Sequence, residues 1–215
     1  MTHSVRVIVL SSTKVGEKSL VLHTLSRDWG RRSFITTVGN GRSMAFYLPL
    51  SILDAEIVEN PKSDLWRLHA VSAAWPLNGI RTSAYKNSMT MFMSEVLFRT
   101  LRDGTYEDGL YEWCEKSILT LDALESDFSN YHLRFLLEFC GALGFSPSTE
   151  DIAPFAGPRL KDIQALLTLS FADSMVYPLS GDSRSEIADS LVKYLGFHTE
   201  SRLNIRSLSV LRELF

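Results

Sequence analysis

Cationic side chains are concentrated at the start of this 215-residue chain. Residues 1–45 contain seven Lys or Arg and two acidic residues, a net charge of +5 in a chain whose overall charge is −3. Guanidinium and ammonium groups neutralise the phosphates of nucleic acids, so this asymmetry favours a nucleic-acid surface joined to an acidic body. The seven cations are Arg6, Lys14, Lys18, Arg27, Arg31, Arg32 and Arg42.

Other kinds of site find little support in the residues. Glu17 stands between Gly16 and Lys18, where an acidic side chain would repel phosphate, so this segment is not a phosphate-binding loop. The histidines lack the spacing of metal ligands, and two cysteines are too few for a cysteine zinc site. Cys114 and Cys140 lie in apolar helical patterns, which predicts buried thiols in a reducing cytoplasm. No cofactor is expected, and no motif points to an enzyme.

The first 75 residues have the pattern of a small β-barrel. Apolar and β-branched residues alternate with a period of two, and Gly, Asn and Pro separate the runs. Five short strands in such a stretch predict a five-stranded OB-fold, although an SH3-like barrel has a similar pattern. The predicted strands are Val5–Leu10, Ser19–Leu25, Ser33–Val38, Leu50–Val58 and Trp66–Ala73.

The pattern acquires a helical period after Pro76 and Gly79. We therefore predict an α+β fold with an OB-fold over residues 1–78 and an all-α helical domain over residues 79–215. The run 129–143 is apolar on most sides, which predicts a helix in the middle of the bundle. No apolar run reaches the length of about 18 residues that a membrane-spanning helix needs. Helices are expected at 85–97, 109–124, 129–143, 160–170, 185–195 and 207–214, and the proline-rich segment 146–158 is expected to be a loop.

Short motifs follow one another in a definite order through both predicted domains. They are Gly16-Glu17-Lys18-Ser19-Leu20, Leu25–Arg31, Leu48-Pro49-Leu50, Pro76–Ile80, Arg134–Glu138, Leu143–Pro147 and Arg206–Leu211. Together these motifs resemble the RecO family of bacterial recombination mediators. Each motif is short, but their order and spacing extend over nearly the whole chain.

The resemblance implies a non-enzymatic protein with an OB-fold, a helical domain and no catalytic residue. Proteins of this family bind single- and double-stranded DNA, anneal complementary strands and work with RecR. They assist the loading of the recombinase on strands coated by single-stranded-DNA-binding protein, whose acidic C-terminal tail they recognise. On this resemblance the chain is expected to mediate DNA repair and homologous recombination in the bacterial cytoplasm, in association with the nucleoid.

The sequence departs from the family pattern at two places. Many members have a four-cysteine zinc finger after the central helix, whereas residues 146–158 contain no cysteine, so no zinc is expected. Many members also have a strongly basic loop after the third strand, whereas Val38-Gly39-Asn40-Gly41-Arg42 contains a single cation. This loop predicts either a lower DNA affinity or a binding surface that lies elsewhere.

The predicted DNA contacts are the cations at turns and strand ends, with Trp29 as a platform for base stacking. The alternative for each cation is a solvated barrel surface, and the alternative for Trp29 is a side chain that closes one end of the barrel. Phe34, Phe46 and Tyr47 are expected in the core. The predicted nucleic-acid-binding residues are Lys14, Lys18, Arg27, Trp29, Arg31, Arg32 and Arg42.

A second predicted site lies in the helical domain. A peptide tail needs an apolar pocket with a cation beside it for the carboxylate, and Arg134 begins the most apolar helix of the chain. Arg134 is therefore predicted to bind the partner's C-terminal tail, the alternative being a local pair with Asp127 or with Glu138 at i+4. Residues 80–215 carry a net charge of −6, which argues against DNA contact through this domain as a whole.

A different class of function stays open on the same observations. The acidic net charge and the poorly charged loop over 38–42 are also compatible with a protein–protein adaptor that has little DNA affinity of its own. Strand annealing by the purified protein would count against the adaptor.

Overall fold

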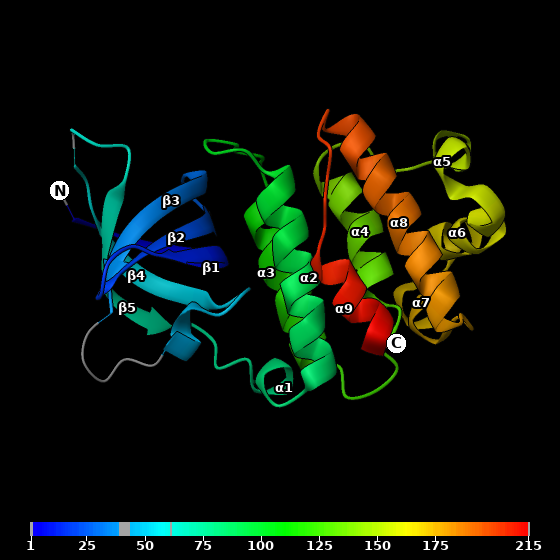
Figure 1. Ribbon diagram of the computed structural model, residues 1–215, viewed down its shortest axis with the longest axis horizontal. Coiled ribbons are helices and arrows are strands. Elements are labelled where there is room, and N and C mark those ends of the chain that lie inside the picture. The colour runs from blue at the N-terminus through cyan, green and yellow to red at the C-terminus, as the bar shows by residue number, and fades with distance from the viewer. Residues whose placement is uncertain (1, 39–43, 61, 215) are drawn as a thin grey trace.

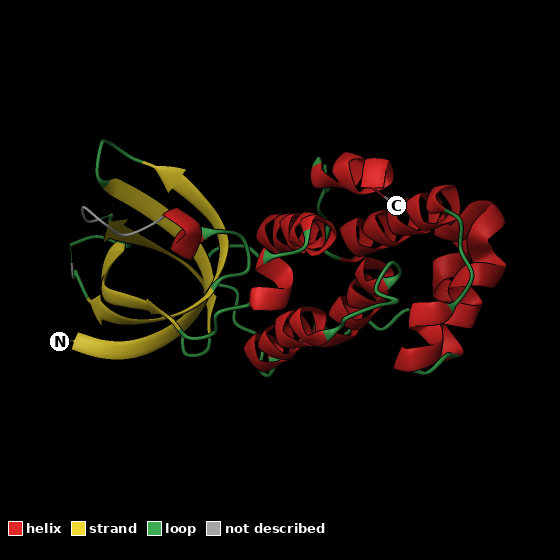
Figure 2. Ribbon diagram, turned by 90° about the horizontal axis from the view of Figure 1, so that it is seen from below, coloured by secondary structure: helices red, strands yellow, loops and turns green. Residues whose placement is uncertain are grey.

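The computed structural model describes residues 2–38, 44–60 and 62–214. A β-barrel and a bundle of helices lie side by side along the longest axis of the molecule (Figure 1). The second view shows the same division, with the strands at one end and the long helices at the other (Figure 2). The predicted α+β fold, a barrel followed by a helical region, is confirmed.

The described residues contain five strands that close into a barrel in the order β1-β2-β3-β5-β4. β3 and β5 are parallel and the other neighbouring strands are antiparallel, which is the mixed arrangement of an OB-fold. A short 3₁₀ helix, η1 (Met44–Tyr47), precedes β4. The strands are β1 (Thr2–Lys14), β2 (Ser19–Ser26), β3 (Gly30–Thr37), β4 (Ile52–Val58) and β5 (Trp66–Ala73).

β1 is longer at both ends than the prediction of Val5–Leu10, because it has two partners. Its first half pairs with β4 and its second half pairs with β2, so this one strand closes the barrel. The register of its pairing with β2 shifts between Val9 and Ser11. A bulge of this kind bends a strand and increases its twist, which lets β1 pass from one neighbour to the other.

Nine α-helices follow in the described part of the chain. The central helix α4 contacts α2, α3, α7 and α8 and lies inside the bundle, as its apolar pattern predicted (Figure 1). The short helix α7 was not predicted; the hydroxyl of Ser170 caps it by accepting a hydrogen bond from the amide of Asp173 at 3.2 Å. The helices are α1 (Asn78–Arg81), α2 (Ala84–Thr100), α3 (Leu110–Ala123), α4 (Tyr131–Ala142), α5 (Thr149–Ala156), α6 (Leu160–Thr168), α7 (Phe171–Val176), α8 (Gly181–His198) and α9 (Ser207–Leu214), with the 3₁₀ helix η2 (Gly157–Arg159) after α5.

The prediction of a loop over residues 146–158 is wrong, because α5 and most of η2 lie there. Ser148 and Asp151 form a capping box, in which the side chain of each residue bonds the backbone amide of the other. Ile152 and Ala156 are buried in the core of the bundle, and α5 packs against α8. Packing and the cap therefore stabilise this helix although it contains Pro154. The prolines of the segment are the reason that the sequence pattern indicated a loop instead.

The hydrophobic core of the bundle continues into the barrel. One cluster of buried residues fills the inside of the barrel and includes the fully buried Leu22 and Phe34. The larger cluster fills the bundle and also includes residues from the barrel wall that faces the helices. These residues are Ile8, Leu10, Leu25, Leu50 and Ile52. β5 ends at Ala73 and α1 begins at Asn78, and the division into domains 1–78 and 79–215 stays a prediction.

Candidate nucleic-acid interface

The predicted cations form two groups at opposite ends of β2. Lys14 and Lys18 lie where β1 turns into β2, and the second group surrounds the turn from β2 into β3. β2 has eight residues, so its ends lie roughly 23 Å apart at about 3.3 Å per residue. The structure therefore does not bring all of the predicted contacts into one cluster.

The first group consists of exposed lysines on a tight turn. Gly16 makes this turn possible, because its φ of 79° is a conformation that favours glycine. Among the described residues, neither Lys14 nor Lys18 has an ion-pair partner, so their ammonium groups are available to bind phosphate. The amide of Val38 donates to the carbonyl of Lys18 at 2.8 Å, which brings the end of β3 beside this turn. The predicted contact Arg42 lies outside the described residues.

In the second group, Arg32 stacks on an aromatic ring. Its guanidinium carbon lies 3.5 Å from the centre of the Trp66 ring, and Nη2 donates to the carbonyl of Asp64 at 3.4 Å. Trp29 meets the same indole edge to face, with ring centres 6.0 Å apart. A guanidinium and two indoles together have the chemistry of a surface that binds phosphate and stacks on bases. A cavity of about 490 Å³ adjoins Trp29 and Arg32.

Sequence reasoning identified Trp29 but did not single out Trp66 as a site residue. Trp66 begins β5, and it lies beside Arg32 because β5 pairs in parallel with β3, with Phe34 opposite Trp66. A parallel pairing between distant strands leaves no local signal in the sequence. Trp29 also packs against the core of the barrel, in agreement with the alternative expectation for it, and base stacking by Trp29 stays a prediction.

Arg31 differs from its neighbour because its side chain is buried. Its Nη1 forms an ion pair with Asp103 at 2.8 Å, and its guanidinium lies 5.1 Å from the ring of Phe98 on α2. Burial lowers the pKa of Arg31, and the charge of Asp103 opposes this shift. The guanidinium therefore lies between the barrel and the helical region, a position that favours a structural role. The DNA contact that the sequence predicted for Arg31 is not tested by this geometry.

The backbone of Arg31 joins the barrel to the loop between α2 and α3. Its amide donates to the carbonyl of Thr105, and its carbonyl accepts from the amide of Gly104, each at 2.8 Å. Gly30 is required beside this contact, because a Cβ atom there would lie 2.1 Å from the carbonyl oxygen of Thr105. The glycine and the arginine of the Gly30-Arg31 motif thus both serve the contact with the loop between α2 and α3, which the sequence of the motif alone does not reveal.

Arg27 also faces the helical region. Its Nε pairs with Glu112 at 2.8 Å, and its guanidinium lies 5.4 Å from the centre of the Tyr111 ring. Both Arg27 and Glu112 are exposed, so a phosphate can compete for the guanidinium at a small energetic cost. This arginine consequently remains a weaker candidate than the two lysines.

Arg134, the predicted tail-binding residue, forms a local ion pair. Its Nε donates to Glu138 at 2.6 Å, and its Nη1 donates to the carbonyl of Leu169 at 3.3 Å. The pair with Glu138 is the alternative that the i+4 spacing predicted, and it is confirmed. Binding of a partner tail by Arg134 stays a prediction.

The expected aromatic core is confirmed at two of its three positions. Phe34 and Tyr47 are buried inside the barrel. The expectation for Phe46 is wrong, because 38% of this residue is exposed. Phe46 and Tyr47 are consecutive in η1, and neighbouring residues of a helical turn point in different directions, so only Tyr47 enters the core.

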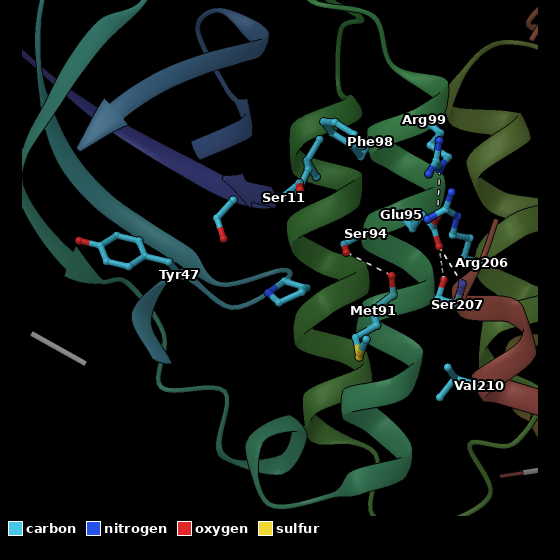
Figure 3. Close-up of a pocket in the computed structure, with 13 residues that line it drawn as sticks. Ser11, Tyr47, Met91, Ser94, Glu95, Phe98, Arg99, Arg206, Ser207 and Val210 are labelled. Carbon is cyan, nitrogen blue, oxygen red and sulfur yellow. Dashed lines mark hydrogen bonds and ion pairs between the residues drawn. The ribbon is translucent and has the colours of Figure 1, made fainter. Parts of the chain in front are cut away.

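The groove between the barrel and α2 contains further polar groups (Figure 3). Glu95 accepts hydrogen bonds from the amide and hydroxyl of Ser207 at 2.8 and 2.7 Å, which hold the first turn of α9 on α2. Arg99 bonds the same carboxylate at 2.9 Å. The groove has a volume of about 520 Å³, and Ser11 and Tyr47 lie on its barrel side.

The cysteines lie in the interior of the bundle. Cys114 and Cys140 are buried free thiols, as predicted, and burial raises the pKa of Cys140 to about 12. Over residues 2–38, 44–60 and 62–214, three or more His, Cys, Asp or Glu side chains do not gather in a way that could hold a metal ion. None of the helices that the structure describes is both long enough and apolar enough to cross a membrane.

The chain thus has an OB-fold barrel with exposed lysines joined to a helical bundle. Proteins of this class are suited to binding single-stranded nucleic acid. Two family models match the chain: "Recombination protein O N terminal" over residues 1–75 and "Recombination protein O C terminal" over residues 81–153. The chain belongs to the RecO family. The expectation of a non-enzymatic DNA repair protein agrees with this membership.

Similar proteins match over nearly their whole length. The DNA repair protein RecO of Phocaeicola vulgatus is 29% identical, with 97% of each chain covered. The proteins of the same name from Flavobacterium johnsoniae and Flavobacterium psychrophilum are 28% and 27% identical, with 98% of each chain covered. The similarity therefore extends through both the barrel and the helical bundle.

Proposed function

We propose that this protein mediates DNA repair and homologous recombination in the bacterial cytoplasm by binding and annealing DNA. It would assist recombinase loading on strands coated by single-stranded-DNA-binding protein, without being an enzyme. The observation that supports this most directly is the full-length similarity to DNA repair proteins in a chain whose barrel presents exposed cations. Family membership supports the general role, and the accessible cations support direct DNA contact.

The proposed binding surface uses charge and stacking without reading a sequence. Lys14 and Lys18 attract phosphates at one end of β2, and Arg32 with Trp66 offers a cation and an aromatic face at the other end. The distance of roughly 23 Å between these ends is a span of several nucleotides for an extended strand. Arg31 contributes by holding the barrel against the helical region.

The proposed partners beyond DNA are RecR and the acidic tail of single-stranded-DNA-binding protein. For the tail, Arg134 is the proposed contact in the helical region. A carboxylate of the tail would have to replace the bond of Arg134 to Glu138, which is partly exposed. That exchange keeps the charge of Arg134 paired and is compatible with a reversible contact.

The adaptor is the second candidate, and one observation favours it. Arg27 and Arg31 are already paired with Glu112 and Asp103, so the second group of cations has less charge to offer DNA than its sequence indicates. An adaptor of this kind would bind partner proteins and leave the annealing of strands unchanged.

The annealing of two complementary labelled oligonucleotides, followed by energy transfer, separates these functions. The mediator predicts faster annealing with the wild type and a loss of about tenfold in the rate with Lys14→Gln and Lys18→Gln combined. Lys161→Gln is the matched control, because it removes an exposed lysine from α6, far along the chain from the barrel. An annealing rate that the wild type does not increase would leave the adaptor as the better account.

A further inference from the structure

A second surface feature lies where the chain passes from the barrel into the bundle. A cavity of about 470 Å³ opens between η1 and the segment that follows it, the start of β4, and the first residues of the helical region. Ile52 and Leu53 are buried residues that line it, and Trp75 lines it from the connection between β5 and α1. The lysines of the proposed DNA surface do not belong to this cavity.

Three large apolar side chains around this cavity are exposed. Phe46 and Leu48 are each 38% exposed, and Trp75 is 45% exposed. Apolar side chains that gather around a hollow are typical of interaction sites, and tryptophan is among the residues that contribute most to protein interfaces. Phe46 was expected in the core of the barrel but is exposed beside this cavity, so packing of the barrel does not explain why a large apolar residue is found there.

One cationic side chain lies at the wall of the cavity. Arg81 donates from Nη2 to the hydroxyl of Ser51 at 2.7 Å and to the carbonyl of Pro49 at 3.4 Å, and both acceptors are neutral. Within the described parts of the chain, no carboxylate forms an ion pair with Arg81. Burial lowers the pKa of Arg81, and the charge of Asp122 opposes this shift. Asp122 uses its Oδ1 to accept from the amide of Ile80 at 2.8 Å.

An arginine bound only to neutral acceptors beside an apolar cavity defines the partner that would complement it. A carboxylate can form a charge-assisted, bidentate bond with a guanidinium, and a neighbouring bulky side chain can fill the apolar hollow. A nucleic acid would also satisfy the cation, and its bases could stack on Trp75. The aliphatic walls formed by Ile52 and Leu53, however, match a bulky apolar side chain better than a base. The charge and the shape together therefore favour an acidic protein segment.

We propose that this cavity, the Trp75–Arg81 pocket, binds a segment of a partner protein that carries a large apolar side chain next to a carboxylate. The apolar side chain enters between Phe46 and Trp75, and the carboxylate bonds Arg81. This interaction surface is separate from Arg134 and does not depend on the DNA-binding proposal, so each can fail without the other.

A random dodecapeptide library displayed on phage tests the pocket in the full-length protein. We expect selected peptides to share an aromatic or large aliphatic residue within two positions of Asp or Glu. A synthetic peptide of the selected sequence should bind about tenfold more weakly to Arg81→Gln and to Trp75→Ala, and equally weakly to wild type when its acidic residue becomes an amide. Arg202→Gln is the matched control, because Arg202 is an exposed arginine outside the pocket.

Folding and self-association are checked with the same proteins. Arg81→Lys keeps the charge but not the bidentate geometry, and an intermediate affinity with an unchanged melting temperature separates binding from loss of structure. The proposal is overturned if selected peptides lack acidic residues or bind the Arg81 and Trp75 variants as well as the wild type. Sedimentation that gives a wild-type dimer and a Trp75→Ala monomer would also overturn it, because the pocket would then join two copies of this chain.

Discussion

At the scale of single residues, exposure and pairing decide which cations can contact DNA. Lys14 and Lys18 are exposed on a turn, whereas Arg31 is buried against Phe98 and paired with Asp103. A guanidinium that is buried and already paired, even with an exposed carboxylate, is costly to move to a phosphate. The charge count of a segment therefore overestimates the charge that the folded protein offers to a nucleic acid.

The neighbouring arginines Arg31 and Arg32 are expected to differ when each is replaced by Gln. Arg32→Gln should weaken binding to all DNA sequences alike and reduce the salt dependence by about one phosphate contact. Arg31→Gln should lower the melting temperature and leave the salt dependence unchanged, because its guanidinium pairs with Asp103. DNA titrations at several salt concentrations measure the salt dependence, and thermal denaturation measures the melting temperature. An equal loss of slope in the two variants would contradict the assignment.

Some of these residue roles could be predicted from sequence and others could not. The turn that contains Lys14 and Lys18 follows from local glycine chemistry, and the pair of Arg134 with Glu138 follows from helical spacing. The pairing of Arg31 with Asp103 depends on a contact between the barrel and a distant loop. No pattern within either segment contains that information.

At the scale of elements, the loop between α2 and α3 fastens the barrel to the bundle. It bonds the backbone of Arg31 on both sides and needs a glycine at position 30 for its close approach. The strands themselves were predictable because their side chains alternate, whereas α5 was not, because its cap and its packing outweigh the prolines. Local patterns therefore identify elements better than they identify the contacts between them.

The close approach at Gly30 predicts an asymmetry between two glycine substitutions. Gly30→Ala should lower the free energy of unfolding by about 3 kcal/mol, because it adds both a steric clash and strain at a φ of 58°. Gly104→Ala is the matched control, with a φ of 82° and, apart from its own residue and its two chain neighbours, no atom of the described residues within 4 Å of its Cβ. It should cost about 1 kcal/mol, and chemical denaturation that gives equal losses would contradict the close contact.

The attachment of α9 should depend on pH through Glu95. Burial raises the pKa of Glu95, but the bonds from Ser207 and Arg99 outweigh burial and bring this pKa below its ordinary value of 4.5. A lowered pKa means that the carboxylate stabilises the fold above about pH 4.5 and loses this effect as the pH falls through the folded-state value. Glu95→Gln should therefore cost about 1 kcal/mol at pH 7 and less at pH 3 to 4.

Denaturation of the wild type and of Glu95→Gln at a series of pH values measures this difference directly. The same substitution should leave the affinity for DNA unchanged, since Glu95 is not among the proposed contacts. A difference in stability that stays constant from pH 7 to pH 3 would show that the carboxylate charge does not hold α9 in place.

At the scale of the whole molecule, the barrel and the bundle share one hydrophobic cluster. Residues on the outer wall of the barrel, including Ile8 and Leu25, are buried with the helices, and the Arg31 backbone contacts add to this junction. A boundary at residue 78 follows from the change of period in the sequence, but the periodicity gave no sign of how much apolar surface crosses it. A strand that is buried on both faces has the same apolar sequence pattern whether its second face packs against a sheet or against a helix.

The shared core predicts that the barrel and the bundle unfold together. Calorimetry of the full-length chain should give a single transition, with the calorimetric and van 't Hoff enthalpies equal. Gly30→Ala should shift this transition to a lower temperature without splitting it. Two separate transitions in the wild type would contradict a common core.

The central claim is that the accessible cations of the barrel bind DNA, and fluorescence anisotropy of a labelled single-stranded oligonucleotide tests it most directly. Binding at low salt should weaken steeply at moderate salt, as the release of counterions from phosphates requires. Lys14→Gln combined with Lys18→Gln should bind more weakly with a shallower salt dependence, and Lys161→Gln should match the wild type. An absence of binding at low salt, or binding that salt does not alter, would contradict the account.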